Sequence, residues 1–154
     1  MTRWLTVVAT AVAFSWASGA GIADVSTPAE DVKRAPASIN VDRDYDRGVR
    51  ARVMKDWPVA VEAFRKVVAG RADFADAWNE LGFALRNLRR YPEALAAYGE
   101  ALRLRPEFPE ALEYLGEAYV DLRQLEDARK ILVRLRKVDT RRAQELADII
   151  AKAQ

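Results

Sequence analysis

The fold is decided by residues 75–108, which read ADAWNELGFALRNLRRYPEALAAYGEALRLRPEF. Apolar residues recur there every three or four positions, the spacing that places them on one face of a helix, and the pattern is interrupted once, near residue 90. Pro92 fits the first turn of a second helix, whereas Pro106 cannot continue that helix and so ends it. Because the connection between the two helices is short, we expect them to pack as an antiparallel pair.

The same pattern occurs three times along the chain. It is marked by small residues that return after 34 positions, namely Gly48, Gly82 and Gly116 in one set and Ala60, Ala94 and Ala128 in another. Small residues on facing helices allow the two backbones to approach closely. A fixed spacing of this kind is typical of helix pairs stacked into a solenoid, which usually offers a surface to a partner. The pattern predicts seven helices, at residues 42–54, 58–69, 75–88, 92–104, 109–122, 126–138 and 141–153.

The residues of this period resemble the tetratricopeptide repeat. In the stretch 75–108 the family's signature positions are occupied by Ala75, Trp78, Leu81, Gly82, Leu85, Ala94, Tyr98, Ala101 and Pro106. The stretch that begins at Pro109 matches equally well until Thr140, where the family has proline, so its second helix is expected to run on slightly. The turn positions Trp57, Tyr91 and Leu125 are expected to be structural.

The resemblance implies an all-α fold, a right-handed α-solenoid of three helix-turn-helix repeats with a C-terminal capping helix. The expected boundaries are residues 41–74, 75–108 and 109–140 for the repeats and 141–154 for the capping helix, which should cover Ile131, Leu132 and Leu135. The first repeat carries Asp44 and Arg47 where large apolar residues are usual. Polar residues suit an end repeat without an outer neighbour, and they predict that its first helix is weak and free to fray or to dock a partner.

In this family the first helix of each pair lines a concave groove. By resemblance, the candidate groove residues are Tyr45, Val49, Arg52, Asn79, Phe83, Arg86, Asn87, Glu110, Glu113, Glu117 and Asp121. Phe83 and Tyr45 are the expected anchors for an apolar side chain of the partner. Some relatives hold a partner's terminal carboxylate with cations at these positions, and the acidic residues of the third repeat disfavour that mode here.

The four acidic groove residues of the third repeat stand three or four positions apart and therefore project from one helix face. Like charges at this spacing destabilise a helix by about 0.2 to 0.5 kcal/mol per pair. Two interpretations remain open at this stage. The acids form an ordinary solvated face, or they form a stripe that selects a lysine or arginine of the partner.

The composition excludes much catalytic chemistry. The chain contains no histidine and no cysteine, which removes disulfides, imidazole and thiolate metal ligands and the commonest general base. After residue 40 the only serine or threonine is Thr140. We therefore expect a protein that is not an enzyme and that uses no cofactor and no metal. A hydrolase that uses the carboxylates of Glu113 and Glu117 is the remote alternative.

The charge balance gives little reason to expect nucleic acid as a partner. The chain has 25 Lys plus Arg and 23 Asp plus Glu, a formal net charge of +2. A basic cluster at residues 129–142 has no interleaved aromatic residues of the kind that stack on bases. This cluster is compatible with contact to an anionic membrane surface but does not require it.

The N-terminal sequence predicts export. Arg3 supplies a positive charge, residues 4–16 are apolar and uncharged, and small residues follow that suit cleavage after Ala20 or Ala23. We expect a signal peptide at residues 1–23 and a disordered linker at residues 24–40. An uncleaved anchor is the alternative, but the apolar run is shorter than the roughly 18 to 20 residues needed to span a bilayer.

Together these features predict a non-catalytic adaptor or scaffold of the cell envelope, periplasmic or secreted. Its expected partner is a protein or peptide segment, with a basic side chain favoured, bound in the groove. The chain is expected to be a monomer or a weak homodimer. A self-associating structural module is the alternative within the same class of binding proteins.

Overall fold

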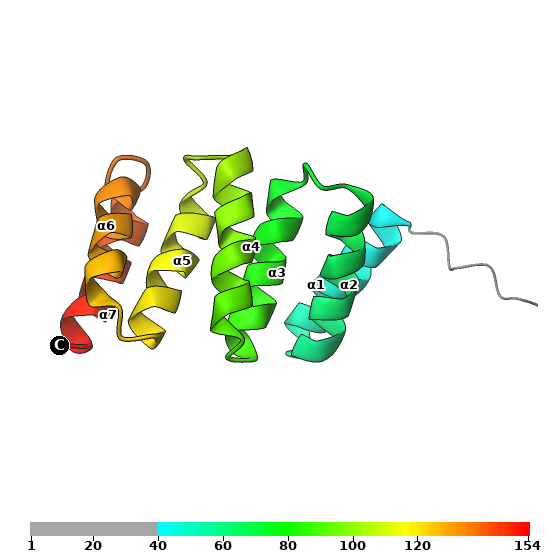
Figure 1. The fold of residues 1–154 in the computed structure, drawn as a ribbon, viewed down its shortest axis with the longest axis horizontal. Coiled ribbons are helices and arrows are strands. Elements are labelled where there is room, and N and C mark those ends of the chain that lie inside the picture. The colour runs from blue at the N-terminus through cyan, green and yellow to red at the C-terminus, as the bar shows by residue number, and fades with distance from the viewer. Residues whose placement is uncertain (1–39) are drawn as a thin grey trace, which may run out of the picture. The chain divides into compact units, whose positions relative to one another are not determined.

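The structure, a computed structural model, describes residues 40–154 and contains seven α-helices and no strands in that part of the chain. The helices are α1 (Val41–Val53), α2 (Trp57–Gly70), α3 (Ala75–Asn87), α4 (Tyr91–Leu104), α5 (Pro109–Asp121), α6 (Leu125–Leu135) and α7 (Thr140–Lys152). Three antiparallel hairpins follow one another side by side, and α7 closes the series (Figure 1). This arrangement confirms the predicted all-α repeat solenoid. The predicted signal peptide and all but the last residue of the predicted linker lie outside the described residues.

The hairpin turns are built in the same way in all three repeats. Lys55, Arg89 and Arg123 follow the first helices and have left-handed backbones, with φ of 59°, 58° and 61°. In each turn the next residue donates its backbone N–H to a carbonyl five positions earlier, as Arg90 does to Leu85 at 2.9 Å. These bonds satisfy carbonyls at the end of the helix. The turns therefore repeat with the same period as the core, although no glycine marks them.

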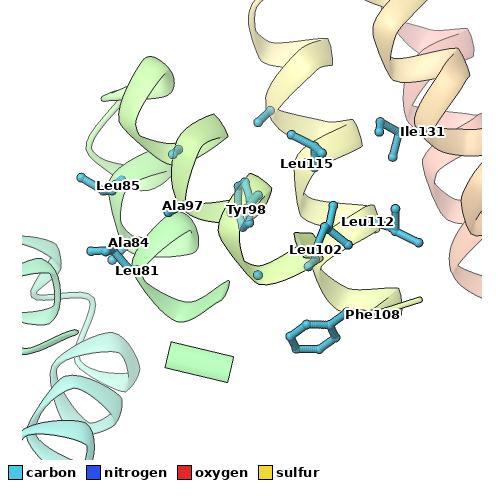
Figure 2. Close-up of a cluster of buried hydrophobic side chains, with 14 of the residues drawn as sticks. Leu81, Ala84, Leu85, Ala97, Tyr98, Leu102, Phe108, Leu112, Leu115 and Ile131 are labelled. Atoms are coloured by element: carbon cyan, nitrogen blue, oxygen red, sulfur yellow. The ribbon is translucent and has the colours of Figure 1, made fainter. Parts of the chain in front are cut away.

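In the first two repeats the two helices of a pair meet at a close contact between a glycine and an aromatic ring. A Cβ atom placed on Gly82 of α3 would lie 2.7 Å from the ring of Tyr98 on α4, and one on Gly48 of α1 would lie 2.6 Å from the ring of Phe64 on α2. No side chain fits at either position. Figure 2 shows Tyr98 in the buried cluster, with Leu112 of α5 among its other members. The prediction that small residues let the two helices of a pair approach closely is thus correct for Gly48 and Gly82.

The third repeat is completed differently. The three atoms nearest to a Cβ atom placed on Gly116 of α5 all belong to Leu146 of α7, whereas Gly48 and Gly82 meet rings of the second helix of their own repeat. The capping helix therefore packs against α5 as well as α6. The sequence predicts that the capping helix covers Ile131, Leu132 and Leu135 of α6, and the structure adds a contact with α5, where Leu146 fills the space that Tyr98 fills in the second repeat.

Two helices, α6 and α1, differ from the sequence-based prediction in length or in regularity. α6 ends at Leu135 and not near residue 138, because the backbone N–H of Asp139 turns back to Leu135 at 2.8 Å and the Asp139 side chain then caps α7. The expectation that this helix runs on is wrong.

α1 is a regular helix of 13 residues, begun by Asn40, whose side chain accepts from the N–H of Arg43. None of the helices in residues 40–154 is long and apolar enough to cross a membrane.

Candidate protein-binding groove

All eleven predicted groove residues lie on the first helices of the three repeats. α1 carries Tyr45, Val49 and Arg52, α3 carries Asn79, Phe83, Arg86 and Asn87, and α5 carries Glu110, Glu113, Glu117 and Asp121. Ion pairs join α1 to α3 and α3 to α5, so their predicted faces are neighbours. We call this surface the α1–α3–α5 face.

The two predicted aromatic anchors are half-buried among other rings. Phe83 packs against Trp57 and Tyr114, with ring centroids 5.8 and 5.0 Å apart. Tyr45 packs against Phe64 and Phe74 in the same way, at 5.7 and 5.0 Å. Each anchor is therefore held rigidly by its neighbours. Rigid aromatic side chains bind at a small entropic cost, so a partner side chain that reaches their exposed parts meets a preformed surface.

The acidic stripe on α5 is partly neutralised by two arginines from its neighbouring helices. Arg86 of α3 donates from Nε to Asp121 Oδ2 at 2.7 Å and also pairs with Glu117. Arg142 of α7 pairs with Glu110 at 2.6 Å and with Glu113. The four acids are therefore not a row of unpaired, repelling charges. Each carboxylate has a cationic partner within the chain, but the two arginines compensate only half of the negative charge of the stripe.

Burial makes these ion pairs matter more than surface pairs do. Glu113 is only 6% exposed, and burial raises its pKa, while the hydrogen bond and charge of Arg142 act in the opposite direction. Burial also disfavours the charge of Arg86, but Asp121 and Glu117 outweigh it together and raise the pKa of this guanidinium. Both arginines therefore stay charged and hold α5 to its neighbours.

A further pair joins α1 to α3. Arg52 Nε lies 3.0 Å from Glu80 Oε2, and the Arg52 guanidinium lies 5.9 Å from the centroid of the Phe83 ring. Burial raises the pKa of Glu80, opposed by Arg52. Beside it, Asn79 is only 4% exposed and its Oδ1 has no hydrogen-bond partner in residues 40–154. Val49 is half-buried in the same region. Arg52 is thus already paired with Glu80 of the same chain, and Asn79 is buried.

A cavity of about 400 Å³ brings four of the predicted residues together. Its lining consists of Phe83, Arg86, Asn87, Arg89, Tyr91 and Asp121. Asn87 is exposed and donates to the carbonyl of Phe83 at 2.8 Å. Arg89 is exposed and makes no ion pair within the described residues. This cavity has an aromatic wall formed by Phe83 and Tyr91 and is otherwise lined by polar and charged side chains, so it offers hydrogen-bond donors beside an apolar surface.

A larger cavity of about 630 Å³ lies elsewhere, along α2 and the turn before α4. It contains none of the predicted residues. Its rim charges are paired with neighbouring residues, as Arg65 is with Glu93 across the two helices at 2.5 Å. We therefore place the candidate site at the smaller cavity, which is lined by four of the eleven predicted residues, although the second predicted anchor, Tyr45, does not line it.

Two models of known families match the chain, and both are described as tetratricopeptide repeat. One covers residues 45–95 and the other covers residues 86–153, so together they extend from α1 to α7. The chain belongs to the tetratricopeptide repeat family. No characterised protein matches its sequence at a significant level.

Solved structures of tetratricopeptide domains share this fold. The yeast structure "TPR2B-domain:pHsp70-complex of yeast Sti1" is 24% identical, with a TM-score of 0.70, and covers 75% of this chain and 97% of that one. The first TPR of Spaghetti (RPAP3), bound to the HSP90 peptide SRMEEVD, is 17% identical with a TM-score of 0.69, over 73% and 91% of the two chains. A CopN-Scc3 complex is 24% identical with a TM-score of 0.66, over 80% and 82%.

Tetratricopeptide repeats are non-catalytic modules of protein interaction, so this chain is not an enzyme. The structure gives no support to the hydrolase alternative. Glu113 and Glu117 are each bound to a different arginine, and neither lines the cavity at Phe83. A carboxylate held in an ion pair is a poor general base.

Sequence reasoning missed several residues that shape this tetratricopeptide surface. The sequence predicts only a structural role for Trp57 and Tyr91, but Trp57 supports Phe83 and Tyr91 lines the cavity. Their equivalent turn positions, 34 residues apart, are the signal that could have placed them near the groove. Arg142 gives no such signal, because the helix that carries it lies after the third repeat.

Proposed function

We propose that this protein is a non-catalytic adaptor of the cell envelope that binds a segment of a partner protein at the α1–α3–α5 face. The observation that carries this proposal is the cavity in which Phe83, Arg86, Asn87 and Asp121 converge. The fold neighbours described above include domains bound to Hsp70 and HSP90 peptides, which supports a peptide segment as the ligand.

The chemistry of the cavity favours an extended segment with one apolar anchor. The exposed part of the Phe83 ring suits an aliphatic or aromatic side chain, and Asn87 and Arg89 suit the carbonyl groups beside it. A basic residue of the partner has only Asp121 to approach among the residues that line the cavity, and this carboxylate is shared with Arg86. Recognition therefore depends on the apolar anchor first and on charge second.

The affinity is expected to be modest. Three repeats give a short binding surface, and exposed ion pairs at its rim contribute under about 1 kcal/mol each. A dissociation constant on the order of micromolar is the natural expectation for such a surface. The chain then acts as a monomeric or weakly dimeric adaptor whose partners exchange readily, without nucleic acid and without a required membrane contact.

The proposed location rests on the N-terminal sequence. Arg3 followed by the apolar run 4–16 and several small residues is the pattern of an export signal. Cell fractionation followed by mass spectrometry of the N-terminus tests this part. A cytoplasmic protein that keeps its first residues would overturn the envelope assignment and leave the binding surface untouched.

Site-specific crosslinking tests the binding surface. A photoreactive amino acid at Asn87 should capture a partner protein in the cells that make this chain, because Asn87 is exposed at the cavity. Gly99 of α4 is the matched control site, since a Cβ there meets no atom within 4 Å. Equal capture from both sites would contradict a specific groove.

Substitutions then separate binding from folding. Phe83→Ala should weaken the captured complex about tenfold or more if Phe83 is the anchor. Because Phe83 also packs against Trp57 and Tyr114, Asn87→Arg is the second variant, which blocks the cavity from an exposed position. Unchanged binding in both variants would rule out this cavity.

A further inference from the structure

The outer face of α1 is charged, whereas the equivalent face of α3 is a packing surface. Arg43, Arg47, Arg50 and Met54 occupy the positions that Ala77, Leu81, Ala84 and Leu88 occupy in the second repeat. They stand four, three and four positions apart, so they form one row along the helix and the turn that follows it. We call this row the α1 edge.

In the later repeats these positions form the contact between hairpins. Ala77 and Ala84 are 0% exposed, as are Ala111 and Ala118 at the same positions of α5. α3 packs against α2 of the preceding hairpin, and α5 packs against α4. The α1 edge therefore stands where a preceding second helix would pack, and no helix of the described chain packs there.

The cations of the α1 edge are largely available. Arg43 and Arg50 are exposed and form no ion pair within residues 40–154. Arg47 pairs with Glu62 at 3.2 Å, but both side chains remain well exposed. Three aspartates also lie on α1, of which Asp42 and Asp46 are exposed beside the row and Asp44 is buried. The positions of the row itself hold three arginines and no acid, so the row is a cationic line along the helix.

An apolar contact point lies at the end of this row. Met54 is 80% exposed and its neighbour Val53 is 71% exposed. The equivalent of Met54 in the second repeat is Leu88, which is half-buried and lies beside Pro58 and Val61 of the preceding α2. Met54 therefore has the position and chemistry of a residue that contacts a preceding helix, although residues 40–154 supply no such helix.

We propose that the α1 edge docks an acidic amphipathic helix of a partner protein, in the place of a preceding second helix. Acidic side chains of that helix would pair with Arg43, Arg47 and Arg50, and one apolar side chain would cover Met54. Charge complementarity selects this occupant, since the row is cationic where the later repeats are apolar. The site lies on a different face from the cavity at Phe83, so the chain would join two partners.

The test uses the full chain and a synthetic helical peptide. The peptide carries three glutamates at spacings that match the three arginines and one leucine a turn beyond them, and the matched peptide has glutamine in place of each glutamate. Isothermal titration should show the glutamate peptide binding at least about tenfold more tightly, with an affinity that falls as salt is raised.

Charge reversal at the edge supplies the second readout. The double variant Arg43→Glu/Arg50→Glu should lose at least about tenfold in affinity for the glutamate peptide, whereas Arg136→Glu/Lys137→Glu, at two exposed positions beyond α6, should lose less than about twofold. Met54→Gln should weaken binding of both peptides. Circular dichroism checks that each variant keeps its helices, and Asn87→Arg should leave this binding unchanged because it belongs to the other surface.

Several outcomes would overturn the proposal. One is equal affinity for the two peptides, and another is unchanged affinity after charge reversal at Arg43 and Arg50. Binding of anionic phosphatidylglycerol vesicles that is lost in the same variant, without peptide binding, would assign the edge to a membrane surface. Self-association that is lost in this variant, without peptide binding, would assign it to a second copy of the chain.

Discussion

The terminal repeats at the two ends of this solenoid each have a face without a neighbouring repeat, and the two faces differ. At the C-terminal end, α7 packs on α5 and α6, and its Leu146 fills the space beside Gly116. At the N-terminal end no helix of residues 40–154 covers the outer face of α1, which presents arginines and an exposed Met54. One end is closed by apolar burial and the other is made soluble by charge.

The difference shows what a repeat sequence does and does not determine. Within each hairpin the glycine, the alanine and the turn recur with the period, so the hairpins fold alike. At the ends the period no longer specifies a neighbour, and each end residue is free to serve solubility, capping or binding. The ends are therefore where this chain departs from its family and where substitutions should differ most.

The largest expected effect contrasts Leu146 with Met54. Leu146 is fully buried, so Leu146→Ala should destabilise the fold by about 2 to 5 kcal/mol through lost burial and a cavity beside Gly116. Met54 is 80% exposed, so Met54→Ala should change stability by less than about 0.5 kcal/mol. Urea denaturation of both variants measures the contrast. Similar losses would mean that the N-terminal end is also covered.

The next effect concerns the charge that α7 brings to α5. Arg142→Gln removes the partner of Glu113, which is nearly buried, and should cost about 1 to 3 kcal/mol at neutral pH. The matched control is Arg141→Gln, because the Arg141 side chain pairs with the exposed Glu145 on the same helix. The control should change the unfolding free energy by under about 1 kcal/mol in the same urea experiment. Losses of equal size would mean that burial of Glu113 gives its ion pair no special weight.

The same variant has a defined pH dependence. Burial raises the pKa of Glu113, so the folded chain holds this proton more tightly than the unfolded chain, and ionised Glu113 disfavours folding above its folded pKa. Without Arg142 this pKa should rise further. The loss in Arg142→Gln should therefore shrink as the pH falls from about 7 to about 5, as measured by urea midpoints at both values. A loss that grows on acidification would contradict this account.

The fold can be predicted from the sequence because each hairpin carries its own complete pattern. The candidate site can be predicted only in part. Positions within the repeat place the candidate groove residues on the first helices of the repeats, where the structure also has them. Of the two ion pairs that join α5 to its neighbours, Arg86 reaches Asp121 across 35 positions and Arg142 reaches Glu110 across 32. The first pair is one repeat plus one residue and follows the period. The second depends on how α7 docks, which no repeat specifies.

A smaller effect separates the glycines of the second and third repeats. In Gly82→Ala the new methyl group would meet the Tyr98 ring at 2.7 Å, and a packed ring cannot rotate away, so a net loss of about 1 to 2 kcal/mol is expected. In Gly116→Ala the contact is the flexible end of Leu146. A shift of that side chain, with a helix-propensity gain of about 1 kcal/mol, should leave stability nearly unchanged. Thermal melts compare the two, and equal losses would remove this distinction between the repeats.

The smallest effect on stability is expected at the α1 edge. The triple variant Arg43→Ala/Arg47→Leu/Arg50→Ala gives this face the residues of the second repeat and should change the unfolding free energy by less than about 1 kcal/mol, because exposed arginines contribute little. The triple variant should self-associate, because it exposes an apolar face of the kind that packs between hairpins, and this face can pack against a second copy of the chain. Sedimentation equilibrium measures this. A stable variant that stays monomeric at high concentration would show that the arginines are not what keeps this end open, and the contrast between the two ends would then need another cause.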